Sequence, residues 1–208
     1  MWCLNAQPET VTLADGSRIE IRPLGHGDER LVEALYERMS PESRRRRFLV
    51  APPQLTPEDL RRLTDVDHRR DEALVALDPA TGLAVGEARY VRVPGDAGAA
   101  EVAAMVADDW QRRGVATALL DQLTERARAN GIDRYIAVVA VDNEPVLQAL
   151  ERQGARRTAT EPHEVELELD LSSSGMPERL ESALRWAGSR QLRLLGGLAR
   201  RVASWSPR

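Results

Sequence analysis

The chain has 208 residues, of which 33 are acidic and 29 are basic, and every basic residue is an arginine. An apolar content of 42% with a single cysteine, Cys3, is enough for a hydrophobic core and excludes a wholly disordered chain, a collagen-like chain and a disulfide-rich scaffold. No apolar run approaches the length of a membrane-spanning helix, and the first residues lack the pattern of a signal peptide, so we expect a cytoplasmic protein.

Charge is distributed unevenly along the chain. Residues 172–208 carry seven Arg against two Glu, a net charge of +5, which leaves −9 on residues 1–171 out of the total of −4. An acidic body disfavours nucleic acid as a partner, because phosphate binding needs clustered cations. It favours cationic substrates such as amines through long-range electrostatic steering.

The first part of the chain predicts a strand followed by two helices. Residues 18–22 (R-I-E-I-R) alternate between polar and apolar side chains, which is typical of a strand with one buried face. Asp28 is placed to cap a helix that has apolar residues at helical spacing. Residues 40–53 are basic, end in two prolines and predict a turn. Residues 56–59 (T-P-E-D) combine a capping threonine, a proline and two acids, the pattern of a helix start.

The rest of the chain predicts five strands and two helices. The strands are expected at residues 73–77, 83–93, 99–107, 134–141 and 165–169, the first two as a hairpin. One helix is expected over residues 114–130, with Asn130-Gly131 as its left-handed end. The other begins at residues 142–145 (D-N-E-P) and runs to residue 154. This order of elements predicts an α/β (α+β) protein, a mixed sheet with helices on its faces.

Residues 111–117 (Q-R-R-G-V-A-T) form the motif that carries chemical information. They lie between a predicted strand and a predicted helix start, and the small residues at positions 114 and 116 allow a ligand to approach the backbone closely. The N–H groups and the positive dipole end of such a helix can bind a pyrophosphate without a metal ion. The spacing is neither that of a Walker loop nor that of a dinucleotide fingerprint. A helix start with a chance glycine is the alternative interpretation.

This segment resembles the acetyl-CoA-binding core of the GNAT N-acetyltransferase superfamily, whose signature Q/R-x-x-G-x-G/A is met by Gln111, Gly114 and Ala116. Other segments resemble the GNAT domain of bacterial protein lysine acetyltransferases of the Pat type, namely residues 40–43 with 47–48, 55–58, 63–67, and 100–102 with 108–111. The resemblance implies a GNAT fold with a mixed, mostly antiparallel central sheet of about seven strands and helices on both faces. It divides the chain into an N-terminal segment (1–16), a GNAT acetyltransferase domain (17–171), and a linker with a basic amphipathic helical tail (172–208).

The resemblance also implies acetyl-CoA as co-substrate and assigns residues to its parts. The pyrophosphate is expected at the motif, whose residues are Gln111, Arg112, Arg113, Gly114, Val115, Ala116 and Thr117. The pantetheine arm is expected along the strand that contains Met105 and Val106, where splayed strands leave room for the thioester. A backbone N–H near Val106 would stabilise the oxyanion. Asn143 stands where the family contacts the pantetheine or the neighbouring backbone, and a helix cap is its alternative or additional role.

Glu101 is the general base that the resemblance implies, because it stands at the position of the family's glutamate, on the strand just before the motif. A lysine-like amine has a pKa near 10.4, so roughly one in a few thousand is neutral at pH 7, and a base must take a proton directly or through water. Burial in an apolar strand raises the pKa of a carboxyl group, which suits this role. The alternative is a solvent-facing strand residue. Glu87, on the preceding strand, is the reserve candidate.

One position departs from the family pattern. Many GNAT enzymes carry a tyrosine seven residues after the asparagine, as the acid that protonates the leaving thiolate, and here that position is Leu150. The chain's tyrosines lie elsewhere, at Tyr36, Tyr90 and Tyr135, so the acid is unassigned and water is the alternative proton donor. The three histidines are not spaced as metal ligands, so we expect no metal at His26, His68 or His163.

The function that the resemblance implies is transfer of an acetyl group from acetyl-CoA to a primary amine, with protein lysine as the preferred acceptor. A small-molecule amine N-acetyltransferase and a non-catalytic acyl-CoA-binding regulatory module are the alternatives. Residues 44–47 are either a solvated turn or part of the acceptor side. The amphipathic tail leaves four partners open: the body of the same chain, a second copy, a partner protein or a membrane surface.

Overall fold

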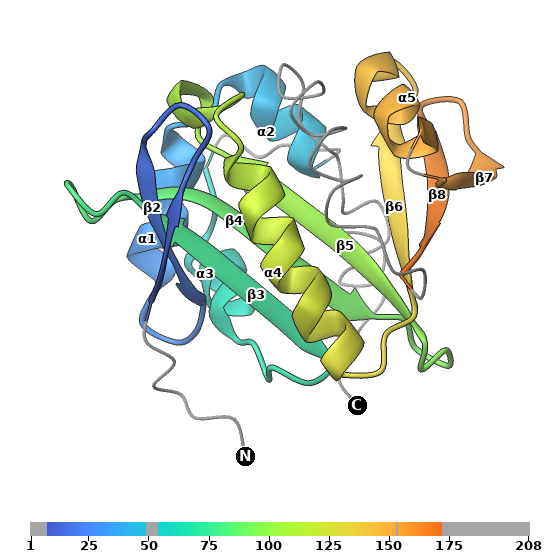
Figure 1. The fold of residues 1–208 in the computed structure, drawn as a ribbon, viewed down its shortest axis with the longest axis horizontal. Helices are drawn as coiled ribbons and strands as arrows, with labels where there is room; N and C mark the ends of the chain where they lie inside the picture. Colours follow the sequence, from blue (N-terminus) through green and yellow to red (C-terminus); the bar gives the residue numbers. More distant parts are fainter. Residues whose placement is uncertain (1–7, 49–53, 153, 172–208) are drawn as a thin grey trace.

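One eight-stranded sheet forms the centre of the computed structural model, which describes residues 8–48, 54–152 and 154–171 (Figure 1). Its strand order is β1-β2-β3-β4-β5-β6-β8-β7. The strands are β1 (Glu9–Thr12), β2 (Arg18–Pro23), β3 (Asp71–Leu77), β4 (Ala84–Arg92), β5 (Ala99–Val106), β6 (Arg134–Ala140), β7 (Arg156–Thr160) and β8 (Glu164–Asp170). All neighbours are antiparallel except β5 and β6, which are parallel. The mixed, mostly antiparallel sheet is therefore confirmed, with eight strands in place of about seven.

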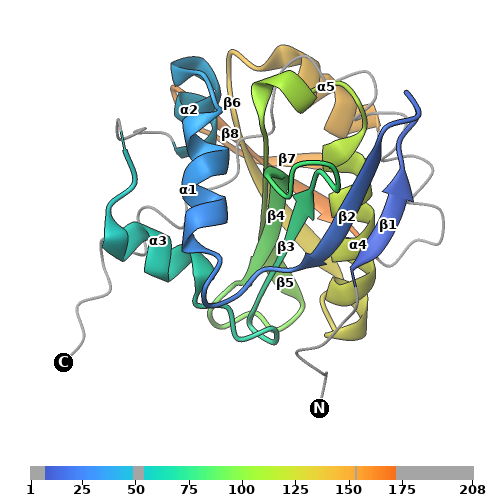
Figure 2. The ribbon, with the colours of Figure 1, turned by 90° about the vertical axis from the view of Figure 1, so that its left-hand side faces the viewer.

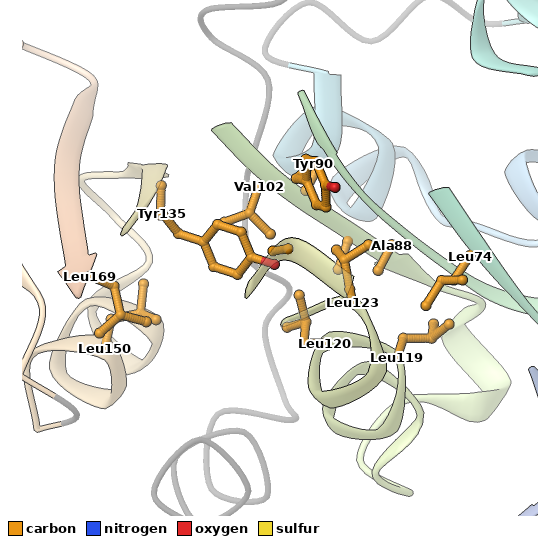
Figure 3. Close-up of a cluster of buried hydrophobic side chains, with 14 of the residues drawn as sticks. Leu74, Ala88, Tyr90, Val102, Leu119, Leu120, Leu123, Tyr135, Leu150 and Leu169 are labelled. Carbon is orange, nitrogen blue, oxygen red and sulfur yellow. The ribbon is translucent and has the colours of Figure 1, made fainter. Parts of the chain in front are cut away.

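Helices cover both faces of this sheet. They are α1 (Glu29–Glu37), α2 (Pro41–Phe48), α3 (Pro57–Thr64), α4 (Val115–Ala129) and α5 (Glu144–Arg152), with a short 3-10 helix η1 (Asp108–Trp110) before α4. Figure 2 shows α1 and α3 on one side of the sheet and α4 on the other. One buried apolar cluster joins α4 and α5 to the sheet (Figure 3), and a second joins α1 and α3 to the opposite face.

Local sequence signals account for several of these elements. In β2 the alternation buries Ile19 and Ile21 against the core. At the start of α3 the Thr56 hydroxyl accepts from the Asp59 N–H at 3.2 Å, and the Asp59 carboxylate accepts from the Thr56 N–H at 2.9 Å, a complete capping box. Gly131 has the expected left-handed conformation after α4, with a φ of 76°. Caps and alternation thus fix these element boundaries locally.

Two local predictions are wrong. Residues 41–48, expected in a turn, form helix α2 instead. Asp28 stands at the N-cap of α1 but its side chain makes no capping bond. Its carboxylate accepts instead from the Arg22 guanidinium at 2.7 and 2.8 Å and from the Gly25 N–H at 3.0 Å. Burial opposes the charge on Asp28, but these bonds hold the pKa of its carboxyl group below the ordinary value.

Three elements have no counterpart in the prediction. β1 lies in the segment expected to precede the domain and pairs with β2. β7 has five exposed residues, so its sequence shows no alternation, and η1 is a single turn. Cys3 and the tail of residues 172–208 lie outside the described residues. Within the described ranges, no helix is both long and apolar enough to cross a membrane.

Candidate functional site

Strands β5 and β6 separate at Glu101, and this separation defines the site. Their parallel register has only three pairs, Ala99 with Arg134, Ala100 with Tyr135 and Glu101 with Ile136. Beyond these pairs β5 continues beside β4 up to Val106 but is no longer paired with β6 in the described part of the chain. Figure 1 shows the two strands diverging toward the end of the sheet where α2 and α5 lie. The expected splayed strands are therefore present.

The loop of residues 111–117 follows β5 at the same end of the sheet. Arg112 has a φ of 65° and Gly114 a φ of 98°, so the chain turns twice through the left-handed region before α4 begins. For a residue with a side chain, such as Arg112, that conformation costs on the order of 1 kcal/mol or more. Helix α4 begins directly after this turn. Its N-cap is Gly114, which has no side chain that could accept hydrogen bonds from the first N–H groups of the helix.

The start of α4 fits a pyrophosphate group. The N–H groups of Val115, Ala116 and Thr117 belong to the first turn, where no intrahelical acceptor exists. The Thr117 hydroxyl is buried, with 7% of the residue exposed, and has no hydrogen-bond partner among the described residues. A buried hydroxyl without a partner is costly unless a ligand or water satisfies it. Donors that converge at a positive helix end are suited to a phosphate oxygen.

The Arg113 side chain stands beside this helix start. Its guanidinium lies 4.8 Å from the centroid of the Trp110 ring, and its Nε is 3.8 Å from the Asp15 carboxylate in the β1–β2 turn. Gly86 on β4 brings α4 close to the sheet, because a β-carbon there would lie 2.8 Å from Val115 Cγ1. The helix start is therefore held by packing from the sheet beneath it.

Asn143 lies at the end of β6, across the separation from the loop. Because β5 and β6 are parallel, their C-terminal ends point to the same end of the sheet. Asn143 and the 111–117 loop, which follow these two strands, therefore lie at that end. Asn143 is fully buried. Its carbonyl accepts from the N–H groups of Val146 and Leu147 at 3.0 and 3.1 Å, so its backbone caps α5. Asn143 thus stands at the start of α5 through its backbone. A cap by its side chain and the pantetheine contact both stay predictions.

Glu101 is half-buried and lies on the acceptor-side face of the sheet, which we define as the face covered by α1 and α3. Side chains alternate along a strand, and Val102 packs into the α4 cluster while Met105 packs into the α1–α3 cluster. Glu101 shares the face of Met105. It therefore stands where β5 and β6 separate, on the side of the sheet opposite to α4.

Glu87, the reserve candidate, is built into the fold. It pairs with Met105 across β4 and β5, so it shares the face of Glu101, but it is fully buried. Its carboxylate accepts from the Arg89 Nε at 2.5 Å, and the same guanidinium donates to the Leu63 carbonyl at 2.7 Å. Through the bond to Leu63, Arg89 joins β4 to the end of α3. A buried carboxylate held by an arginine is poorly placed to take a proton from a substrate.

None of the three tyrosines takes the place of the missing acid. Figure 3 shows Leu150 packed beside Leu169, and it is 5% exposed. Tyr90 and Tyr135 face α4 near its C-terminal end, where the Tyr90 hydroxyl accepts from Asn130 Nδ2 at 2.7 Å. Tyr36 lies on α1 under the Arg44 guanidinium. Burial raises the pKa of all three phenols, which makes them weaker proton donors.

Polar residues that the sequence analysis did not assign connect the loop to the acceptor side. Gln111 Nε2 donates to Asp108 Oδ1 at 2.8 Å, and Asp108 Oδ2 accepts from the Ser40 N–H at 3.1 Å. The Arg38 guanidinium bonds Asp109 Oδ2 at 2.6 Å and the Ala84 carbonyl at 2.9 Å. Both aspartates belong to a segment that the Pat resemblance had marked, which is the signal that could have found them. No group of three or more His, Cys, Asp or Glu among the described residues could hold a metal ion.

Known proteins share this sequence and fold. The sequence model of the family described as acetyltransferase (GNAT) domain matches residues 18–156. An acetyltransferase of Pseudomonas aeruginosa is 34% identical over 134 residues, which cover 64% of this chain and 72% of that protein. The acetyltransferase Pat of Mycolicibacterium smegmatis is 35% identical over 150 residues, 71% of this chain but only 44% of that protein. The crystal structure of the GNAT domain of S. lividans PAT superposes with a TM-score of 0.73 at 30% identity, covering 81% of this chain and 99% of that one.

Proposed function

Because this chain belongs to the GNAT acetyltransferase family and carries out acyl transfer from acetyl-CoA, we propose that its acceptor is the side-chain amine of protein lysine and that Glu101 is the general base. The observation that carries the proposal is the position of Glu101. Glu101 stands where β5 and β6 separate, on the acceptor-side face, and the start of α4, which we propose as the pyrophosphate site, follows the end of the same strand. One strand thus connects the base to the cofactor loop.

The choice of protein lysine rests on two features. The motifs resemble those of Pat-type protein lysine acetyltransferases, and the chain is 35% identical to Pat over 150 residues. The matched segment covers only 44% of Pat, so we propose the activity of Pat for this chain from its acetyltransferase part alone. The net charge of −9 on residues 1–171 favours a cationic acceptor, a protein lysine and a small amine alike, so the choice between these two rests on the resemblance to Pat.

Acetyl-CoA supplies the activated acyl group, and the residues of this chain bind it, orient it and move the protons. The helix start at Val115, Ala116 and Thr117 holds the pyrophosphate, and β5 positions the pantetheine arm beside Met105 and Val106. Glu101 takes the proton of the ammonium, directly or through water, so that the neutral amine can attack. A backbone N–H near Val106 stabilises the oxyanion. After the attack the nitrogen loses its second proton to water, and water protonates the thiolate as it leaves, because Leu150 cannot do so.

The test is transfer of label from acetyl-labelled acetyl-CoA in a whole lysate and in a deproteinised lysate, with Glu101→Gln beside the wild type. We expect label in precipitable protein, reduced about 10²–10⁴-fold by the substitution, which is the range for loss of a general base. Binding of CoA to both proteins, measured by calorimetry, is the control and should be equal. The chain has no lysine, so its own acetylation cannot supply the label except at an N-terminal amine.

Each other outcome points elsewhere. Label confined to the soluble fraction would reject the lysine acceptor and indicate a small amine. Label in protein that survives Glu101→Gln unchanged would reject Glu101 as base. If CoA binds and neither fraction gains label, the chain is a binding module that does not catalyse transfer.

A further inference from the structure

Helix α2 depends on a residue outside itself for its N-terminal cap. Ser40 is the N-cap: its hydroxyl accepts from the Ser43 N–H at 3.2 Å. In a complete capping box the third helical residue also carries an acid that accepts from the N-cap N–H. In α2 that residue is Ser43, which has no carboxylate. The acceptor for the Ser40 N–H is instead Asp108 Oδ2, 3.1 Å away and 68 positions along the chain.

Helix α3 provides the contrast within the same protein. Its cap is complete within four residues, because Asp59 supplies the carboxylate that α2 lacks. An isolated helix of eight residues is not stable in water, so the few bonds at its end weigh heavily. The α3 cap is independent of the rest of the chain. In α2 the Ser40–Ser43 half of the cap is local, and the other half, the bond from the Ser40 N–H to Asp108, exists only while η1 holds its place.

Asp108 is also bonded to the 111–117 loop. Asp108 Oδ1 accepts from Gln111 Nε2 at 2.8 Å, and that amide also lies 3.4 Å from Ser43 Oγ and from the Val106 carbonyl. Each carboxylate oxygen of Asp108 therefore serves one donor, one from α2 and one from the loop. An asparagine has a single acceptor oxygen and cannot serve both donors.

We propose that Asp108 is a positioning residue that couples acetyl-CoA binding to the order of helix α2. CoA at the 111–117 loop fixes Gln111, Gln111 fixes Asp108, and Asp108 completes the cap of α2. That α2 borders the acceptor rests on the proposed function, whereas the coupling itself involves only CoA and this chain.

The experiment is hydrogen exchange of the full chain with and without CoA, followed in peptides from α2, α3 and the start of α4. In the wild type we expect CoA to slow exchange in α2 about fivefold, the factor that one capping interaction provides, and to leave α3 unchanged. In Asp108→Asn the effect on α2 should disappear, while CoA still protects the start of α4. A purely structural role would speed α2 exchange equally with and without CoA.

Two further variants sharpen the test. Asp109→Asn removes the neighbouring carboxylate, which bonds Arg38 and not Gln111, and should leave the CoA effect on α2 intact. Ser43→Asp gives α2 the acid that α3 has, so α2 should be protected without CoA, even together with Asp108→Asn. This variant also serves if Asp108→Asn alone does not fold.

Three results would overturn the proposal. The first is a wild type in which CoA leaves α2 exchange unchanged. The second is an Asp108→Asn protein in which CoA protects α2 as before. The third is a Ser43→Asp protein whose α2 still needs CoA for protection. None of them depends on the identity of the acceptor, so a failed lysine assignment leaves this test intact.

Discussion

At the scale of single residues, environment separates the two glutamates of the acceptor-side face. Glu87 and Glu101 lie on neighbouring strands and point to the same side of the sheet. Glu87 is fully buried and paired with Arg89, whereas Glu101 is half-buried at the end of the β5–β6 pairing. A buried ion pair is costly to break, because the remaining charge is left without its partner. The Glu87–Arg89 pair therefore stabilises the fold, and Glu101 is the glutamate of this face that we propose as the base.

Leu150 offers a test of the missing acid. Because it is buried beside Leu169, a tyrosine there would overpack the core and bring in a hydroxyl without a ready partner. We expect Leu150→Tyr to lower the free energy of unfolding by about 1–3 kcal/mol and to leave kcat without any gain. Thermal unfolding and steady-state kinetics measure both effects. Leu150→Met, which conserves volume, is the control, and a tenfold rise in kcat for the tyrosine variant would contradict this placement.

At the scale of elements, Gly86 connects packing to cofactor binding. A β-carbon at this position would lie 2.8 Å from Val115 Cγ1, 3.0 Å from Leu119 Cδ1 and 3.3 Å from the Met105 carbonyl oxygen. The substitution Gly86→Ala must therefore displace the Val115 and Leu119 side chains, and we expect it to move the start of α4 away from the sheet. We expect a loss of about 1–3 kcal/mol of stability and severalfold weaker CoA binding, because Val115 belongs to the helix start that we propose as the pyrophosphate site.

Calorimetric titration with CoA and thermal unfolding measure these two losses. Gly25→Ala is the matched control, since a β-carbon there meets nothing within 4 Å and its backbone is not in the left-handed region. A Gly86→Ala protein that is less stable but binds CoA as tightly as the wild type would mean that the packing of α4 on the sheet does not affect CoA binding. That result would contradict the prediction.

The same scale explains what the sequence could and could not predict. Helix α3 was predictable because its capping box is local, and α4 because its apolar face repeats at helical spacing. Helix α2 was missed because its sequence, P-E-S-R-R-R-R-F, has no apolar residues at helical spacing, and because part of its cap comes from Asp108, far away in the sequence. Strand β7 was missed because both of its faces are exposed.

Part of the candidate site was likewise predictable from the sequence and part was not. The 111–117 loop was predictable from its glycine and its position before a helix. The contacts of Arg38 and Ser40 with the η1 aspartates were not, because these residues lie about 70 positions apart in the sequence and meet only after the chain has folded. Asp28 shows the converse: its local pattern indicated a cap, but a tertiary contact with Arg22 takes the side chain.

At the scale of the whole molecule, charge predicts how the two substrates respond to salt. Residues 1–171 carry −9, so a cationic acceptor is attracted and the anionic acetyl-CoA is repelled at long range. Salt shortens the range of both effects, from about 30 Å at 0.01 M to about 8 Å at 0.15 M. We expect kcat/KM for a lysine peptide to fall severalfold over this range and kcat/KM for acetyl-CoA to stay level or rise. Steady-state kinetics with each substrate varied in turn measures both, so each substrate is the control for the other. A common fall would indicate an effect of salt on the enzyme itself, and a peptide rate that rises with salt would contradict attraction by the acidic body.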